Sequence, residues 1–240
     1  MLSTQSARRF PLTRLTFSIL VSIFVSSAAQ AITFKPPEDG APKDASSASS
    51  RGGESCRNLH SKESLLSSVV PLIPQSRSGT TLEERPTILL YVSQPGTQQA
   101  LFSVKTSDQM THYEMLIPLA EEARIIAIKL PADAPALEIG ENYKWYFSLE
   151  CEGIWRPAYP IQGKIKRIVP PSSFTALSEK DSIDTAASFG QAGIWYDTAV
   201  KMFQIHSQDP TNNETKRHWE ELLNSVELTQ LTDLNTAIAP

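Results

Sequence analysis

The sequence predicts a mainly β fold, an antiparallel immunoglobulin-like sandwich, followed by a C-terminal α-helical hairpin. Between residues 65 and 169, short runs rich in apolar residues are separated by Pro, Gly, Asn and Asp, which is the pattern of strands joined by turns. After Pro170 and Pro171 the apolar residues recur at intervals of three and four, which is the helical period. These two patterns decide the predicted fold class.

The clearest strand is "NYKWYFSLEC" (142–151). Its apolar residues alternate with polar or charged ones, so Trp145, Phe147 and Cys151 share one face and point into the predicted core. The run "PTILLYV" is apolar throughout its length. Short connections favour antiparallel pairing and a sandwich, and the strands are expected at 86–92, 100–107, 111–119, 123–130, 142–151 and 161–169.

Two antiparallel helices are expected after the strands. The first runs from about Asp184 to Gln208 and stops before Pro210; His206 lies on the same apolar stripe as Trp195 and is expected to be a half-buried packing residue. The second covers about residues 213–228, with Trp219 on its apolar face and His218 expected at the surface. The short connection between them predicts a hairpin.

The N-terminus has the features of a secretory signal peptide. Basic residues precede an apolar run that is too short to span a bilayer, and the small residues Ala29 and Ala31 predict cleavage after Ala31. No later segment is long and apolar enough to cross a membrane. The expected organisation is a signal peptide at 1–31, a Pro-, Ser- and Gly-rich flexible linker at 32–55, a β-sandwich domain at 56–171 and a helical hairpin at 172–240.

Cys56 and Cys151 are the only cysteines. In an exported protein, two cysteines are most simply a disulfide, which here would tie the start of the sandwich domain to the strand that ends at Cys151. Two free thiols in the core are the alternative. Neither cysteine has the spacing of a zinc site with the histidines, so no metal site is predicted.

Composition and motifs exclude several classes of function. Cleavage removes three of the 22 basic residues and none of the 26 acidic ones, which leaves a net charge of −7 and disfavours nucleic acid as a partner. The chain has no Gly-x-Ser-x-Gly elbow and no phosphate-binding glycine loop, and its adjacent acidic pairs point apart. We therefore predict no catalytic residue and no cofactor.

Two surface features are candidates for binding. The proline-containing loop 152–160 carries Trp155, Arg156 and Tyr159, a composition suited to contacts with sugars or proteins. Alternatively, Trp155 folds back over the end of the sandwich. Lys164 and Lys166 share one strand face. Such lysines commonly protect an edge strand from pairing, and contact with an anionic envelope component is the alternative.

The order of several blocks resembles a family of secreted proteins, known chiefly from cyanobacteria, that is classed as a domain of unknown function (DUF 928 type). The blocks are "FKPPEDGAP", "SRGGESC", "SSVVPLIP" before "ERPTILLYV", "LEIGENYKWYFSLEC", "GIWYDTAV" and "HWEELLNSVEL". The glycine-rich part of the linker is shorter here than in that family. The resemblance implies an exported, cysteine-paired β domain with a helical tail, and it implies no activity.

The resulting hypothesis is a non-enzymatic module of the periplasm or cell envelope. It would bind another protein through the sandwich surface or the helical hairpin. A carbohydrate-binding module or an unrecognised hydrolase, with Trp155 at its ligand face, is the alternative. A third possibility is that the hairpin only packs on the sandwich as structure.

Overall fold

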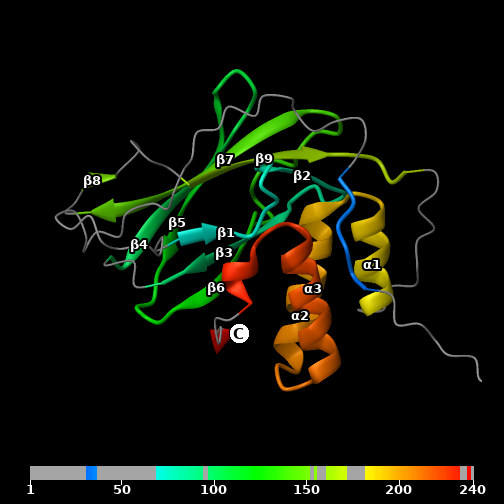
Figure 1. Cartoon of the computed structure of the whole chain (residues 1–240). Helices are drawn as coiled ribbons and strands as arrows, with labels where there is room; N and C mark the ends of the chain where they lie inside the picture. Colours follow the sequence, from blue (N-terminus) through cyan, green and yellow to red (C-terminus); the bar gives the residue numbers. More distant parts are fainter. Residues whose placement is uncertain are drawn as a thin grey trace, which may run out of the picture.

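The chain folds into two β-sheets and three helices (Figure 1). The structure is a computed structural model, and it describes residues 31–36, 69–93, 97–151, 154–155, 161–171, 182–232 and 237–238, without the side chains of 151, 154, 155, 237 and 238. Two mostly antiparallel sheets and a helical C-terminal part are confirmed. The predicted helical hairpin, however, is a set of three helices, so the fold is mixed α and β.

The smaller sheet is built around an apolar central strand. Its strands are β1 (Val69–Pro71), β3 (Thr87–Val92) and β6 (Arg124–Lys129), in the order β1-β3-β6, and the two-residue strand β10 (Ala237–Ile238) runs parallel to β6. All five residues of β3 after Thr87 are buried, so both faces of this strand are covered. This explains why its sequence is apolar throughout rather than alternating.

The larger sheet has the order β2-β9-β7-β4-β5. Its strands are β2 (Ser78–Thr81), β4 (Gln99–Lys105), β5 (Thr111–Pro118), β7 (Asn142–Cys151) and β9 (Ile161–Arg167), and the short strand β8 (Ile154–Trp155) pairs with the end of β7. All neighbours are antiparallel except β2 and β9, which are parallel. The predicted alternation in β7 is confirmed: Trp145 and Phe147 are buried, whereas Lys144 and Tyr146 are half-buried.

The helices are α1 (Ile183–Gln191), α2 (Trp195–Gln208) and α3 (Asn213–Ser225), followed by the 3-10 turn η2 (Thr229–Leu231). The prediction of one helix over 184–208 was wrong, because the chain breaks at Gly193, which has φ of +74°. Ser182 caps α1 and Asn212 caps α3 by accepting hydrogen bonds from backbone N–H groups of the first turn. The stop before Pro210 was predicted correctly.

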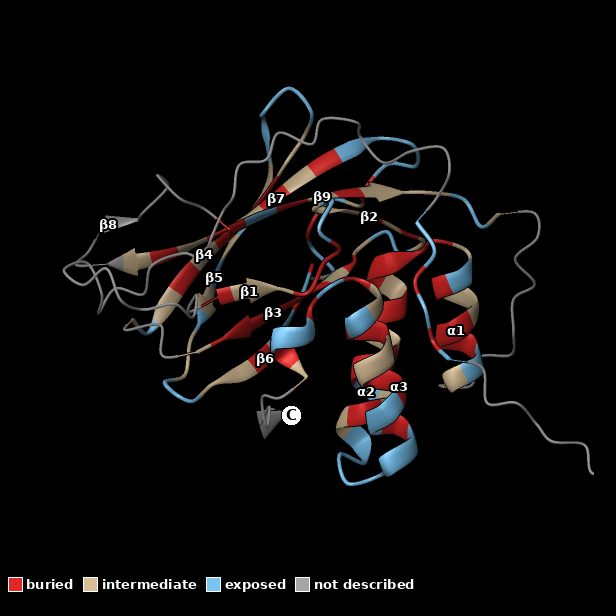
Figure 2. Ribbon diagram, in the orientation of Figure 1, coloured by how far each residue is buried: buried red, intermediate tan, exposed pale blue. Residues whose placement is uncertain are grey.

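One continuous hydrophobic core joins both sheets and all three helices (Figure 2). Helix α2 contacts β2 of the larger sheet and β3 of the smaller one. The core therefore crosses the boundary between the predicted sandwich domain and the predicted hairpin. At the N-terminal side, Ile32 and Phe34 of the predicted linker are buried in the same core, whereas residues 37–55 lie outside the described residues.

Candidate functional site

Helix α2 begins where the two sheets meet, and three consecutive residues attach it there. The Trp195 Nε1–H donates to the Leu72 carbonyl at 2.9 Å. The Tyr196 hydroxyl donates to the Lys164 carbonyl at 3.0 Å and accepts from Trp145 Nε1 at 2.7 Å. These aromatic residues belong to the "GIWYD" block, so this block serves the attachment of the helices to the sheets.

Asp197, the third residue, is a half-buried carboxylate in the first turn of α2. Each of its oxygens lies 3.3 Å from the Leu82 backbone N–H, which donates to them. Burial raises the pKa of the Asp197 carboxyl to about 6, with a smaller contribution from nearby Glu83, against the lowering effect of hydrogen bonds from Thr81 and Leu82. Burial also raises the pKa of the Tyr196 hydroxyl. Both groups face inward and take part in the contact between α2 and the two sheets.

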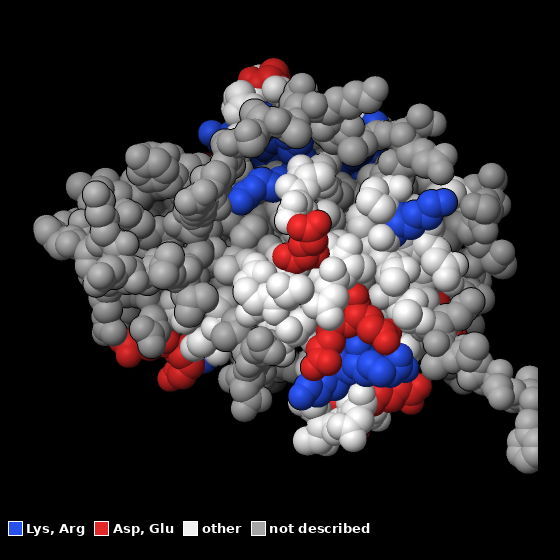
Figure 3. All heavy atoms as spheres, viewed as in Figure 1, with Lys and Arg blue, Asp and Glu red and all other residues white. Residues whose placement is uncertain are grey.

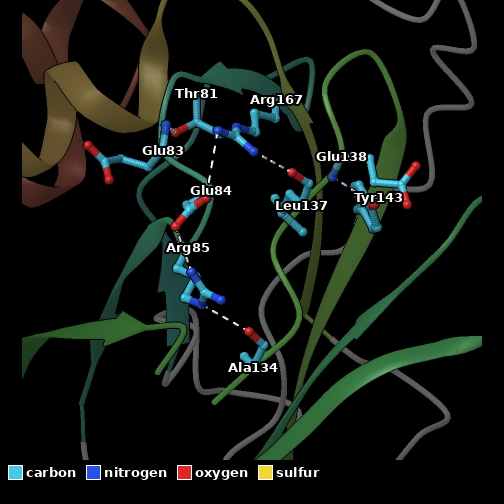
Figure 4. Close-up of polar contacts among 9 residues, drawn as sticks. All are labelled: Thr81, Glu83, Glu84, Arg85, Ala134, Leu137, Glu138, Tyr143 and Arg167. Carbon is cyan, nitrogen blue, oxygen red and sulfur yellow. Dashed lines mark hydrogen bonds and ion pairs between the residues drawn. The ribbon is translucent and has the colours of Figure 1, made fainter. Parts of the chain in front are cut away.

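A second polar cluster holds the loop between β6 and β7 (Figure 4). Arg85 Nε donates to the Ala134 carbonyl at 2.9 Å, and Arg167 Nη1 donates to the Leu137 carbonyl at 2.9 Å. Between the two arginines lies Glu84, at 2.7 Å from Arg85 Nη1 and 3.9 Å from Arg167 Nη2. Because Glu84 offsets part of the positive charge of the two arginines and both arginines bind backbone carbonyls of the loop, we assign the cluster a structural role.

The two histidines in the hairpin are both buried. His206 was predicted as a half-buried packing residue; the packing is confirmed, because it stacks on Trp219 with ring centroids 6.1 Å apart and planes 19° apart, but the residue is buried and not half-buried. His218 was predicted at the surface, and this was wrong, because its side chain is only 2% exposed and lies 3.1 Å from a Glu221 carboxylate oxygen. Within the described ranges, no group of three His, Cys, Asp or Glu side chains could hold a metal ion.

The outer face of the larger sheet carries a row of lysines. Lys144 of β7 lies directly opposite Lys105 of β4 on one side and Lys164 of β9 on the other. Lys166 follows two positions after Lys164 and so shares this face. We call the surface around Lys105, Lys144, Lys164 and Lys166 the lysine face; in Figure 3, Lys and Arg side chains gather around β7 and β9 in the upper part of the view.

The lysine face differs from the arginine cluster because no described carboxylate forms an ion pair with its charges. In the described part of the chain, none of the four lysines has an acidic partner. Lys105 Nζ lies 5.6 Å from the ring centroid of Tyr146, in a cation–π contact. Like charges directly opposite each other on neighbouring strands are destabilising. The row therefore presents positive charge that the described residues do not balance.

The prediction that Lys164 and Lys166 protect an edge strand was wrong. Strand β9 lies inside the sheet, with β2 on one side and β7 on the other, so its backbone is paired on both sides. The partner β2 is missed by sequence reasoning because it has only four residues and no apolar alternation. Ser78 of β2 pairs with Lys164 of β9, 86 positions later in the chain, and a pairing over such a separation leaves no local signal in the sequence.

The other candidate residues lie largely outside the described residues. Trp155 is placed only by its backbone, in β8, where it pairs with Glu150 of β7. Arg156 and Tyr159 are not described, and neither is Cys56. Cys151 ends β7, but its side chain is not described, so the disulfide stays a prediction.

None of the helices in the described ranges has the length and apolar character that crossing a bilayer requires. Comparison with curated proteins finds no match. Comparison with protein families finds one that covers most of the chain: the model described as Domain of Unknown Function (DUF928) matches residues 46–235. The chain therefore belongs to the DUF928 family.

Proposed function

We propose that the protein is a non-enzymatic interaction module of the periplasm or cell envelope that binds an acidic surface of a partner protein through the lysine face. The observation that carries this proposal is the row Lys105, Lys144 and Lys164, in register on three neighbouring strands and without acidic partners among the described residues. The full chain has a net charge of −4, so the row is a local concentration of positive charge in an acidic protein.

An acidic partner would relieve the repulsion within the row. Complementary charge also steers diffusional encounter, and it makes association sensitive to salt. Because β7 and β9 are paired on both sides, a partner cannot add a strand to them. Recognition would thus use side chains, with the half-buried Tyr146 beside Lys105 as an apolar anchor.

The helical hairpin is the weaker of the two surfaces that the sequence nominated. Its large aromatic residues Trp195, Tyr196 and Trp219 are buried in the shared core. The exposed cations of α3 are paired within the helix, where Arg217 lies 2.6 Å from Glu221 and Lys216 lies 3.9 Å from Glu220. This favours the third possibility considered above, in which the hairpin packs on the sheets as structure.

The proposed setting rests on further predictions. Export with cleavage after Ala31, a disulfide between Cys56 and Cys151, an immunoglobulin-like topology and a cyanobacterial source are parts of this proposal. The sequence features of the N-terminus support export, and the position of Cys151 at the end of β7, in phase with buried Phe147 and Leu149, supports pairing inside the core. If the mature protein has the same number of reactive thiols before and after reduction, the predicted disulfide does not exist.

The test is crosslinking capture from cell-envelope extract with matched charge reversals. Lys144→Glu with Lys164→Glu should abolish capture of the partner, whereas Lys129→Glu with Lys216→Glu, which changes the net charge equally elsewhere, should retain it. Capture by the wild type should also weaken as salt rises. A partner captured equally by both double variants would remove the proposal; loss of binding on Trp155→Ala alone would instead support the sugar- or protein-binding loop.

A further inference from the structure

A short N-terminal segment, residues 32–35, lies between α1 and the α2–α3 pair; it is the blue trace in Figure 1. We call it the strap. Ile32 is fully buried and Phe34 is 9% exposed, whereas Thr33 and Lys35 are exposed. This alternation is that of an extended segment with one face directed into the protein.

The strap contacts all three helices. The Lys35 backbone N–H donates to the Gly190 carbonyl of α1 at 3.0 Å, and the Phe34 N–H donates to Ser225 Oγ, on the last residue of α3, at 3.2 Å. The Phe34 ring packs edge-on against Trp195, the first residue of α2, with centroids 5.0 Å apart and planes 77° apart. Backbone hydrogen bonds and pockets for alternate side chains are how proteins bind extended peptides.

The absence of a side chain at Gly190 allows the strap to approach α1 closely. A Cβ at this position would lie 2.9 Å from the Thr33 carbonyl oxygen, closer than such atoms approach. A glycine inside a helix makes the helix less stable than an alanine would, so its presence near the end of α1 needs a reason. The close approach of the strap backbone provides that reason.

We propose that the groove between these helices is a peptide-binding site for an extended segment with apolar residues at alternate positions, and that residues 32–35 of the same chain fill it as a tethered ligand. The 32 residues between Pro36 and Val69 would hold the strap at a high effective concentration beside its site. Ala31, which directly precedes the strap, is exposed, so this end of the strap is open to solvent.

Hydrogen exchange on the intact mature chain is the first test. The Phe34 and Lys35 amides are hydrogen-bonded to the helices, so they exchange only when the strap leaves its site. If the strap is a tethered ligand, it should leave by local opening, and these two amides should exchange faster than the core amides of β7. Gly190→Ala should speed their exchange by about tenfold or more and leave β7 unchanged. Exchange of the strap amides at the rate of β7 would show that the strap is an integral part of the fold and would overturn the proposal.

The second test uses a mature chain with a protease site placed within residues 40–47, which is folded and then cut. A labelled peptide of residues 32–38 should exchange into the groove with one peptide per protein. The Thr33→Ala peptide, altered on its exposed face, should compete equally, and the Phe34→Ala peptide about tenfold or more weakly. Equal competition by both peptides, absence of peptide binding to the cut and folded protein, or unfolding of the sheets on cutting would overturn the proposal.

Discussion

Trp145 Nε1–H of β7 donates a buried hydrogen bond of 2.7 Å to the Tyr196 hydroxyl of α2. The same hydroxyl donates to the Lys164 carbonyl of β9. One phenol therefore links the helices to two strands of the larger sheet, and each of its partners would lose a hydrogen bond if the hydroxyl were removed.

Tyr196→Phe should lower the free energy of unfolding by about 1 to 3 kcal/mol, because it leaves the buried Trp145 N–H without an acceptor. Tyr146→Phe is the control, since the Tyr146 hydroxyl makes an exposed hydrogen bond to Gln109. The control should change stability by less than about 0.5 kcal/mol. Chemical denaturation of both variants measures the difference, and equal effects would contradict the role of the buried bond.

Asp197→Asn should stabilise the protein at neutral pH. Burial raises the pKa of Asp197 to about 6, so between about pH 4 and 6 the folded state binds more protons than the unfolded state. Stability of the wild type therefore falls as pH rises through this window, by on the order of 2 to 3 kcal/mol at this site. Asparagine can still accept from Leu82 N–H without carrying charge.

Unfolding free energies of wild type and Asp197→Asn at pH 4.5 and pH 7.5 test this expectation. The variant should gain stability relative to the wild type as pH rises. A difference between the two proteins that does not change with pH would mean that the carboxyl is not held near its neutral form.

His206 should produce the opposite pH dependence. Its pKa is lowered, mainly by burial and also by Lys216, against the effect of Glu220. Below about pH 6.5 the unfolded state then binds more protons, so the stabilising effect of neutral His206 is lost as pH falls. His206→Gln should remove this loss between pH 7 and pH 5, and His112→Gln, at a site on β5, should retain it. Denaturation at the two pH values measures the slopes.

The arginine cluster should depend on its bonds to backbone more than on its ion pairs. Arg167→Ala removes the donor to the Leu137 carbonyl and should cost about 1 to 3 kcal/mol. Glu84→Ala removes a carboxylate that is about half exposed and should cost less than about 1 kcal/mol. A larger effect of the Glu84 change in thermal or chemical unfolding would reverse this assignment.

The six strands expected from sequence are all present, with bounds that differ by at most two residues from the structure. Local alternation, as in β7, reports which face is buried. It does not report which strands become neighbours, so neither the position of β9 inside the sheet nor the parallel partner β2 could be read from it. The lysine face could not be predicted for the same reason, because Lys144 and Lys164 lie opposite each other only when β7 and β9 pair in this register.

The burial of His218 could have been predicted. The buried residues of α3 recur at three- and four-residue intervals, and His218 lies on this stripe between Thr215 and Leu222. The polar ring of His218 is satisfied in its buried position by a hydrogen bond with the partly exposed Glu221 carboxylate. The strap could not be predicted, because only two apolar residues carry its contacts and their partners lie more than 150 residues away.

Residues 195, 196 and 197 project about 100° apart around the axis of α2, yet each is bonded to the β part of the molecule. The first turn of α2 is therefore held by hydrogen bonds on most of its sides, and the helix is attached to the sheets at its N-terminal end. Its other end, about 20 Å away at Pro210, is steadied chiefly by α3. A small change in the angle of α2 at its first turn would therefore produce a larger displacement at its C-terminal end. The turn at Pro210 should be the most sensitive place to attach a spectroscopic label that reports on loosening of the contact between α2 and the sheets.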